Sequence, residues 1–296
     1  MVHFFQTVIA VRRKTELLLT LPSFLFLTVF FLIPALILIG CAFKEKGLYG
    51  GFGEGWSLSS IYSIFISGNL IVLARTVILS AVATLFTLAL AIPVGYGIAR
   101  STSFWRRLLL VLIIVPSWSS FLIRVYAWKL LLHPEGMLKR FLEIVFFVPA
   151  DTTLLYNDIA VLFVMVYTYL PFAIIPIYTA SQKFNWQLFE AATDLGCTHY
   201  QAFFKVYLPG ISKGISAAIL LVFIPFMGAY VIPDLVGGTH SEMLGNKIAQ
   251  KTLVERDFPD AAALSLLLAF ATTLPLLLMS KFAKKGIELK IQRNVE

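Results

Sequence analysis

Long runs of apolar residues alternate with short polar segments along the whole chain. Each run is close to, or longer than, the roughly 20 residues that a helix needs to cross the hydrocarbon layer of a membrane. Backbone polar groups inside lipid must be satisfied within their own segment, so we expect every run to be an α-helix. The pattern predicts an all-α integral membrane protein with six transmembrane helices, built as a single transmembrane domain over residues 1–296. The predicted spans cover residues 17–43, 69–99, 108–132, 158–180, 214–236 and 259–282.

The basic residues are distributed unevenly between the two sides of this predicted bundle. Fourteen lysines and arginines lie on the side of the two termini, and seven lie on the other side. Cytoplasmic loops carry the excess of Lys and Arg, so the count places both termini in the cytoplasm. The polar segment 181–213, between the fourth and fifth spans, then lies in the cytoplasm as well.

Two segments on the opposite side have distinct compositions. Residues 44–68 are rich in glycine, and we expect them to be irregular. Residues 133–157 contain an apolar stretch, 141–148, that is too short to span a membrane. We expect this stretch to be a helix lying in the membrane interface.

The overall composition agrees with a membrane protein and excludes other classes. Hydrophobic residues make up 59% of the chain and charged residues only 14%, whereas soluble domains are about one quarter charged. The net charge of +8 is explained by cytoplasmic loops, so we expect membrane lipid around the chain and no nucleic acid. The basic residues 12–14 resemble the start of a signal peptide. The run that follows is too long and lacks a small-residue cleavage pattern, which predicts an uncleaved first span.

Neither cysteine indicates a disulfide or a metal site. The predicted topology places Cys41 and Cys197 on opposite sides of the membrane, too far apart to be bridged. Neither has neighbours spaced as metal ligands.

The segment 181–213 has the pattern of two short amphipathic helices. Asn185 is a favourable N-cap, and Gly196 is suited to a left-handed residue ending the first helix. Thr198 and Gln201 have the spacing of a capping box for the second helix, which Leu208-Pro209 ends. Apolar residues recur at helical spacing in both. The predicted apolar stripes are Trp186, Leu188, Phe189, Ala192 and Leu195 in the first helix, and Tyr200, Phe203, Phe204 and Tyr207 in the second.

The charges of the first helix distinguish a protein partner from a membrane surface. A helix pair lying on the inner leaflet would carry Lys and Arg along its polar face. This helix carries Glu190 and Asp194 and no basic residue, which disfavours an anionic membrane surface. The acids suit a protein with basic residues, and the small side chains of Ala191 and Ala192 let the helix enter a cleft.

The spacing from Glu190 to Pro209 resembles the EAA loop of ABC importer permeases. Glu-Ala-Ala is followed by Gly after three residues, then after nine more by Val206, one residue and Leu-Pro; isoleucine is commoner at the Val206 position. The resemblance implies the type I importer (MetI-like) fold, with cytoplasmic coupling helices that dock through residues 185–208 on an ABC ATPase dimer. The ATPase-coupling residues it implies are Glu190, Ala191, Ala192, Asp194, Gly196, Leu208 and Pro209.

No nucleotide site is visible in this chain. It contains no Gly-x-x-x-x-Gly-Lys-Ser/Thr sequence, so it has no P-loop for phosphates. We therefore expect a transport subunit rather than an enzyme, with no cofactor or metal of its own, and with ATP and Mg²⁺ on the partner ATPase.

Two longer segments narrow the resemblance. Residues 116–128 resemble a third-span signature of spermidine/putrescine permeases, and residues 225–238, followed by Leu244-Gly245-Asn246, resemble the fifth span of the same group. The match is to the first of the two homologous permeases in such systems. It implies a bacterial inner-membrane protein, a second permease forming a heterodimer, and a periplasmic or extracellular polyamine-binding protein.

The predicted substrate path consists of Trp118, Tyr126, Tyr230 and Asp234. A flexible polycation suits aromatic faces and one or two acids, because weak serial contacts let it leave as well as enter. Asp234 is the only acid that lies within a predicted span rather than at its very edge. The alternatives are that Asp234 faces water at a helix end and that the aromatic residues are interface anchors.

Other readings stay open. Arg75 and Arg124 would repel a polycation, and in an importer for iron, a phosphonate or another anion they would be substrate contacts; alternatively, Arg124 could pair with Asp234. A membrane-embedded enzyme is disfavoured because the four histidines are remote from one another in sequence. A passive channel would not need the EAA loop.

Overall fold

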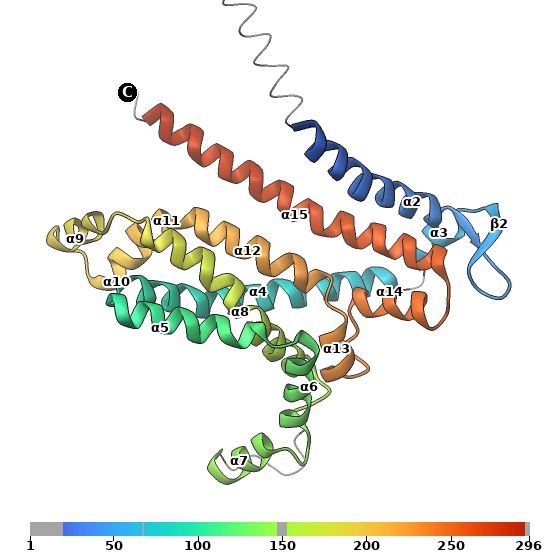
Figure 1. Ribbon diagram of the computed structural model, residues 1–296, viewed down its shortest axis with the longest axis horizontal. Helices are drawn as coiled ribbons and strands as arrows, with labels where there is room; N and C mark the ends of the chain where they lie inside the picture. Colours follow the sequence, from blue (N-terminus) through green and yellow to red (C-terminus); the bar gives the residue numbers. More distant parts are fainter. Residues whose placement is uncertain (1–19, 67, 147–152, 294–296) are drawn as a thin grey trace, which may run out of the picture. The chain divides into compact units, whose positions relative to one another are not determined.

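The computed structural model describes residues 20–66, 68–146 and 153–293, most of which are helical (Figure 1). The contacts of the chain divide it into two compact units. Unit 1 combines the chain up to residue 67 with residues 251–266, and unit 2 contains residues 68–250 and the chain from residue 267 onward. The predicted single domain over residues 1–296 stays a prediction.

In the part of the chain that the structure describes, four helices are long and apolar enough to cross a membrane individually. They are Thr20–Ala42, α4 (Asn69–Arg100), α8 (Asp158–Gln182) and the part Phe258–Pro275 of α15 (Phe258–Arg293). The first contains a π-helical turn, η1 (Thr28–Leu32), directly before α2 (Ile33–Ala42), in which Pro34 lacks a backbone donor. Two bent pairs of helices raise the number of candidate spans in the described chain to six. The predicted all-α class with six spans is confirmed in this form.

The third predicted span is not one helix. The chain runs as α5 (Ser103–Ile114) and a 3₁₀ turn, η2 (Val115–Trp118), and then bends by 92° into α6 (Phe121–Leu132). The predicted span over 108–132 is a bent pair rather than one helix, because Ser119 and Ser120 leave the helical backbone directly after the Pro116 turn. Beyond α6, α7 (Met137–Phe146) forms where the apolar stretch 141–148 predicted a helix; residues 147 and 148 of that stretch lie outside the described residues.

The fifth predicted span is also interrupted. Helix α12 (Ser212–Met227) ends at Gly228, and a separate short helix, α13 (Val231–Val236), follows. Pro233 has no N–H to donate to the carbonyl of Ala229, so a continuous helix would lack a backbone hydrogen bond at this point. The predicted span over 214–236 is therefore divided between two helices, and Asp234 lies on α13 rather than on α12.

Three helices of unit 2 pack closely enough to need glycine at their contacts. Helix α4 packs along α8, and α12 packs against both. A Cβ at Gly95 of α4 would lie 2.7 Å from Ile177 Cγ2 of α8, and a Cβ at Gly214 of α12 would collide with Ala180. Buried hydroxyls on these helices bond to carbonyls one turn earlier, as Thr87 does to Ala83 at 2.7 Å. The result is a closely packed three-helix core.

Unit 1 contains a β-hairpin where the glycine-rich segment predicted irregular chain. Strands β1 (Lys44–Lys46) and β2 (Phe52–Trp56) pair antiparallel, and α3 (Ser59–Ile66) follows. The prediction for 44–68 is wrong because Gly50 and Gly51 adopt φ of +90° and +80°, a backbone region that glycine enters freely and that lets the chain reverse. The ammonium of Lys44 lies 4.7 Å from the Trp56 ring centroid and covers it.

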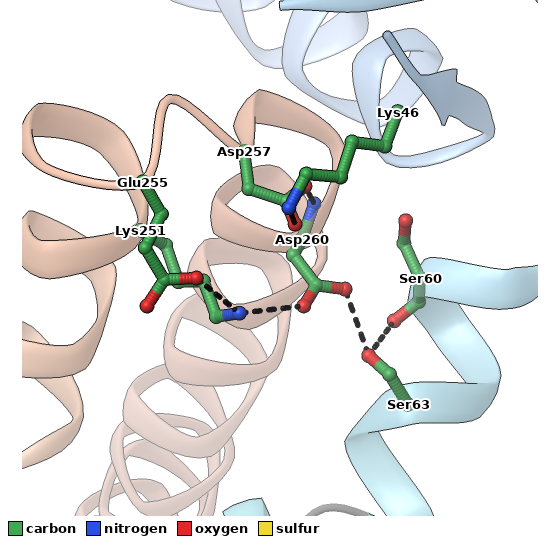
Figure 2. A network of polar contacts seen from close by, with 7 residues as sticks. All are labelled: Lys46, Ser60, Ser63, Lys251, Glu255, Asp257 and Asp260. Atoms are coloured by element: carbon green, nitrogen blue, oxygen red, sulfur yellow. Dashed lines mark hydrogen bonds and ion pairs between the residues drawn. The ribbon is translucent and has the colours of Figure 1, made fainter. Parts of the chain in front are cut away.

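A polar network holds the parts of unit 1 together (Figure 2). Lys46 of the hairpin pairs with Asp257 at 2.8 Å, and Ser63 of α3 donates to Asp260 at 2.8 Å. Lys251, near the end of α14 (Leu244–Leu253), pairs with Glu255 at 2.8 Å and Asp260 at 3.3 Å. Burial alone would lower the pKa of Lys251, but the hydrogen bonds and negative charges of these two acids outweigh it and raise that pKa above 10.5.

Candidate functional site

The first helix of the segment between α8 and α12 has the boundaries that the sequence predicts. Helix α9 (Trp186–Asp194) is capped by Asn185, whose Oδ1 accepts from Gln187 N at 3.1 Å. It ends in a Schellman motif, in which Cys197 N donates to Ala192 O and Gly196 N donates to Thr193 O, both at 3.0 Å. Gly196 has φ of +91°, so the predicted left-handed glycine is confirmed.

The second helix begins as predicted but continues differently. Helix α10 (His199–Ala202) has the predicted capping box of Thr198 and Gln201. A π-helical turn, η3 (Phe203–Tyr207), follows, and then α11 (Leu208–Gly210), which contains Pro209. The chain bends by 70° between Gly210 and Ser212, where α12 begins.

Only part of each predicted apolar stripe faces inward. In α9, Phe189 is buried and Trp186 and Ala192 are half-buried, but Leu188 and Leu195 are 56% and 88% exposed. In the second stripe the wider π turn keeps Phe203 and Tyr207 on the inner face and leaves others outside. Tyr200 and Phe204 are 81% and 62% exposed, so four residues of the two predicted stripes lie on the outside.

Six aromatic rings form the inner support of this segment, which we call the aromatic seat. Tyr96 of α4 makes edge-to-face contacts with Tyr207, Phe203 and Trp186 at centroid distances of 5.0, 5.4 and 5.6 Å. The rings of Trp186 and Tyr207 stack at 5.7 Å. The members of the seat are Tyr96, Phe184, Trp186, Phe189, Phe203 and Tyr207.

Polar contacts fix the edge of the aromatic seat. Ser181 Oγ donates to Ile177 O at 2.7 Å, which leaves the Tyr207 hydroxyl as the donor in its 2.6 Å bond to Ser181. The guanidinium of Arg100, at the end of α4, lies 5.2 Å from the Trp186 ring centroid. The ends of α4 and α8 are thus joined to the segment by rings, a hydroxyl pair and a cation.

The residues predicted for ATPase coupling lie on the outer side of this support. Glu190, Ala191 and Asp194 are exposed on α9, Gly196 and Pro209 are also exposed, and Ala192 and Leu208 are half-buried. Together with the exposed apolar side chains they form what we call the exposed set: Leu188, Glu190, Ala191, Asp194, Leu195, Tyr200 and Phe204. No carboxylate in this set has an ion-pair partner of opposite charge among the pairs found in the described chain.

The predicted substrate-path residues lie around the two breaks in the spans. Trp118 ends η2 at the bend and is 81% exposed, and Tyr126 on α6 is half-exposed. Tyr230 precedes α13, which contacts α6, and Asp234 is exposed on α13. The arrangement brings Tyr126, Tyr230 and Asp234 onto two contacting elements, with Trp118 at the start of one of them.

The segment after α13 fixes the backbone at Tyr230. Asn246 donates from Nδ2 to Tyr230 O at 2.8 Å, and a Cβ at Gly245 would lie 2.5 Å from Ala229 O. Leu244 N donates to Thr76 Oγ1 of α4 at 2.8 Å. Leu244-Gly245-Asn246, singled out in the sequence, is therefore the contact that holds the interruption of the fifth span in place.

The two arginines that the sequence left undecided have different environments. Arg75 of α4 pairs with both carboxylate oxygens of Asp158 in α8, at 2.8 and 2.7 Å. Arg124 of α6 is half-buried, and no ion pair links it to Asp234 within the described chain. Asp158 also lines an open cavity of about 560 Å³ with Tyr156 and residues 237–241. No group of three or more His, Cys, Asp or Glu side chains among the described residues is arranged to hold a metal ion.

Sequence reasoning missed Tyr96, Ser181 and Arg100. All three lie at or next to the ends of predicted spans. An aromatic or basic residue such as Tyr96 or Arg100 is ordinary there, and a serine such as Ser181 does not stand out. The signal that could have found Tyr96 was the large number of aromatic residues in 184–207. Such a cluster predicts a further aromatic residue packed against it from another part of the chain.

The comparisons with known proteins agree on one family. Residues 91–285 match the model of the binding-protein-dependent transport system inner membrane component. The spermidine/putrescine transport system permease protein PotB of Haemophilus influenzae is 32% identical, over 86% of this chain and 90% of its own length. PotB of Escherichia coli strain K12 is also 32% identical, over 93% of this chain and its whole length.

Solved structures show the same fold at low identity. A chain of a bacterial ABC transporter that imports the acidic polysaccharide alginate superposes with a TM-score of 0.71 at 17% identity, covering 95% of this chain and 99% of that one. A chain of the MetNI methionine ABC transporter, in an inward-facing conformation, gives a TM-score of 0.55 at 16% identity, covering 73% and 94%. The predicted type I importer fold is confirmed.

Proposed function

Since the chain belongs to the family of binding-protein-dependent transport system inner membrane components, we propose that it is the permease subunit of an ATP-driven importer of polyamines. Its relatives are named for spermidine and putrescine transport, at about one third identity over most of both chains. This is the support for the substrate class, because the alginate and methionine importers share only the fold.

The segment 185–208 docks on a separate ATPase dimer. The observation that carries this proposal is that a well-capped, ring-supported segment leaves four large apolar side chains and two acids facing outward. Exposed apolar residues gathered on a short segment are typical of an interaction site. The acids call for a cleft with basic residues, and the chain has no P-loop of its own, so the partner supplies ATP hydrolysis with Mg²⁺.

The remaining partners follow from the same assignment. A second, homologous permease completes the pore, because six helices of one chain provide only half of its wall. A periplasmic or extracellular polyamine-binding protein delivers the substrate. The ATPase is cytoplasmic, so the segment 181–213 and both termini lie on the cytoplasmic side of the bacterial inner membrane.

Substrate passes Trp118, Tyr126, Tyr230 and Asp234. Asp234 is exposed on α13, and the three aromatic side chains are about half-exposed or more. One carboxylate and several rings provide cation–π contacts of about 0.5–2 kcal/mol each, weak enough for a polycation to move on. An anion importer is the alternative, but the Arg75 guanidinium is already engaged by Asp158.

Docking is tested by Glu190→Lys, which places a cation on the exposed set. The ATPase should no longer co-purify with the permease pair, while membrane insertion stays normal. Glu135→Lys, at an exposed turn between α6 and α7, is the matched control and should retain the ATPase. Normal co-purification of the ATPase with a chain lacking residues 186–206 would refute docking through this segment.

The substrate path is tested by Asp234→Asn in cells that carry the complete transporter. Spermidine and putrescine uptake should fall about tenfold, the loss expected for roughly 1.4 kcal/mol of lost stabilisation. Complex assembly and binding-protein affinity should not change, and Glu135→Gln should leave uptake unaltered. An unchanged uptake rate would assign Asp234 a structural role, and uptake of a phosphonate instead of polyamines would favour the anion alternative.

A further inference from the structure

The aromatic seat draws five of its six rings from the segment 184–207 itself. The sixth, Tyr96, comes from α4, one turn before that helix ends at Arg100. Its ring makes edge-to-face contacts with Trp186, Phe203 and Tyr207 and lies 6.3 Å from Phe189. Tyr96 therefore touches both α9 and the π turn η3, which are separate elements of the segment.

The helix that carries Tyr96 is held tightly in the three-helix core. Gly95, its neighbour, lies against Ile177 of α8 so closely that a Cβ would approach within 2.7 Å. Tyr207, which Tyr96 contacts at 5.0 Å, is bonded through its hydroxyl to Ser181 at the end of α8. A displacement of α9 would therefore disturb contacts with both α4 and α8. Closely packed side chains resist such a displacement because they do not deform continuously.

We propose, on the premise of the proposed importer function, that Tyr96 is the positioning residue through which movement of the segment 185–208 reaches α4. Its ring meets both halves of the segment, so α9 and η3 move together with the end of α4. The ring carries this role, because Tyr96 meets Trp186, Phe203 and Tyr207 through edge-to-face ring contacts. The exposed set binds the ATPase, and Tyr96 converts that binding into movement of a spanning helix.

The proposal predicts a difference between transport and hydrolysis. In the complete importer in proteoliposomes, with its binding protein, Tyr96→Ala should lower polyamine uptake about tenfold, within the 5–150-fold range of couplings between sites. ATP hydrolysis and the amount of ATPase in the complex should remain within about twofold of the unaltered importer, a change too small to account for a coupling loss. Tyr96→Phe, which keeps the ring, should restore uptake.

Two controls separate this role from simple packing. Phe86→Ala removes an exposed ring from the same helix and should change neither uptake nor hydrolysis. Amide hydrogen exchange in residues 186–207 should increase in Tyr96→Ala, while exchange in residues 160–177 of α8 stays as it was.

Several outcomes would overturn the proposal. Unchanged uptake in Tyr96→Ala, loss of the ATPase from its complex, or a Tyr96→Phe variant as impaired as the alanine variant would each do so. If the unaltered permease itself failed to retain the ATPase, the proposed function would fail instead, which is a distinguishable result. Should Tyr96→Ala not insert, Tyr96→Leu gives the same test with a large apolar side chain retained.

Discussion

The segment between α8 and α12 and the hairpin of unit 1 are both held by side chains remote in sequence, but with different chemistry. The segment rests on six aromatic rings, with one buried hydroxyl pair and one cation at the edge. The hairpin is tied by the ion pair between Lys46 and Asp257 (Figure 2), whose lysine side chain is 51% exposed. Ring packing does not depend on salt or pH. Exposed ion pairs are weakened by added salt and by a pH at which one partner loses its charge.

The two regions also differ in whether their acidic side chains have basic partners. In unit 1 each acid of the network lies beside a lysine, Asp257 beside Lys46 and both Glu255 and Asp260 beside Lys251. In the segment, the interior is satisfied by rings and the two acids of α9 remain without basic partners in the described chain. The inner face of the segment is packed within the chain, whereas its outer face carries acids without basic partners. This combination is what a docking surface for another protein requires.

The largest expected effect comes from removing a buried ring. Phe189 is 1% exposed, and Phe189→Ala should destabilise the segment by about 3–5 kcal/mol, the usual loss for a buried phenylalanine. Phe52→Ala in the hairpin removes a ring that is 51% exposed, and about 1 kcal/mol or less is expected. Limited proteolysis of the purified complex measures both, with new cleavage within 186–207 for the first variant only. Equal sensitivity of the two variants would contradict the comparison.

The next effect is backbone strain at two glycines with the same conformation. Gly196 has φ of +91° and Gly51 has φ of +80°, and neither has atoms near the position of an added Cβ. A valine at either site should introduce about 1–3 kcal/mol of strain. Uptake should be lost only in Gly196→Val, because only that glycine orders α9; the measurement is polyamine uptake at matched expression. A similar loss in Gly51→Val would show that the hairpin matters as much for transport.

A smaller effect is expected from the ion pair of the hairpin. Lys46→Ala leaves Asp257, which is 8% exposed, without its partner, but the exposed lysine limits the loss to about 0.5–1 kcal/mol. Amide exchange in residues 44–56 should increase, and high salt should produce a similar increase in the unaltered protein. Exchange in residues 186–207 should not respond to salt. A salt response there would mean that the aromatic seat is not the main support of the segment.

The smallest effect concerns pH. The pKa of Lys251 is raised above 10.5 in the folded state, so its stabilisation is fully present below that value and is lost as pH rises through the folded pKa. Between about pH 7 and pH 9, the difference in hairpin exchange between the unaltered protein and Lys251→Gln should stay constant. It should shrink only at more alkaline pH. A change between about pH 7 and pH 9 would assign the effect to another group.

The sequence predicted the ends of elements in the segment better than their faces. Asn185, Gly196 and the Thr198–Gln201 pair act within their own turns, so a few neighbouring residues decide their geometry. Which face is buried depends on Tyr96, more than 80 residues from Trp186 along the chain. The apolar spacing of Leu188 and Leu195 could not reveal that the support is narrow, and the π turn at 203–207 shifted the second stripe.

The breaks within the predicted spans were likewise not visible in the local sequence pattern. Hydropathy depends on composition, and a bent pair of helices has the composition of a straight one. Pro116 precedes a bend of 92°, yet α4 and α8 run through Pro93, Pro171 and Pro176 without ending. The hairpin was missed because a glycine-rich segment predicts a flexible chain. The contacts that fix it come from residues remote in sequence: the ion pair of Lys46 with Asp257 and the hydrogen bond from Gly51 N to Arg256 O.

The backbone conformation at the end of α9 determines which residue can occupy position 196. At φ of +91° the backbone of Gly196 is the mirror image of one that L-residues adopt, so side-chain size is irrelevant there; even alanine is strained in open space. A D-alanine introduced by chemical ligation would fit the same site without that strain. Among the encoded residues only the achiral one is free of it, so the glycine of the Glu-Ala-Ala pattern is fixed by stereochemistry before any partner is met.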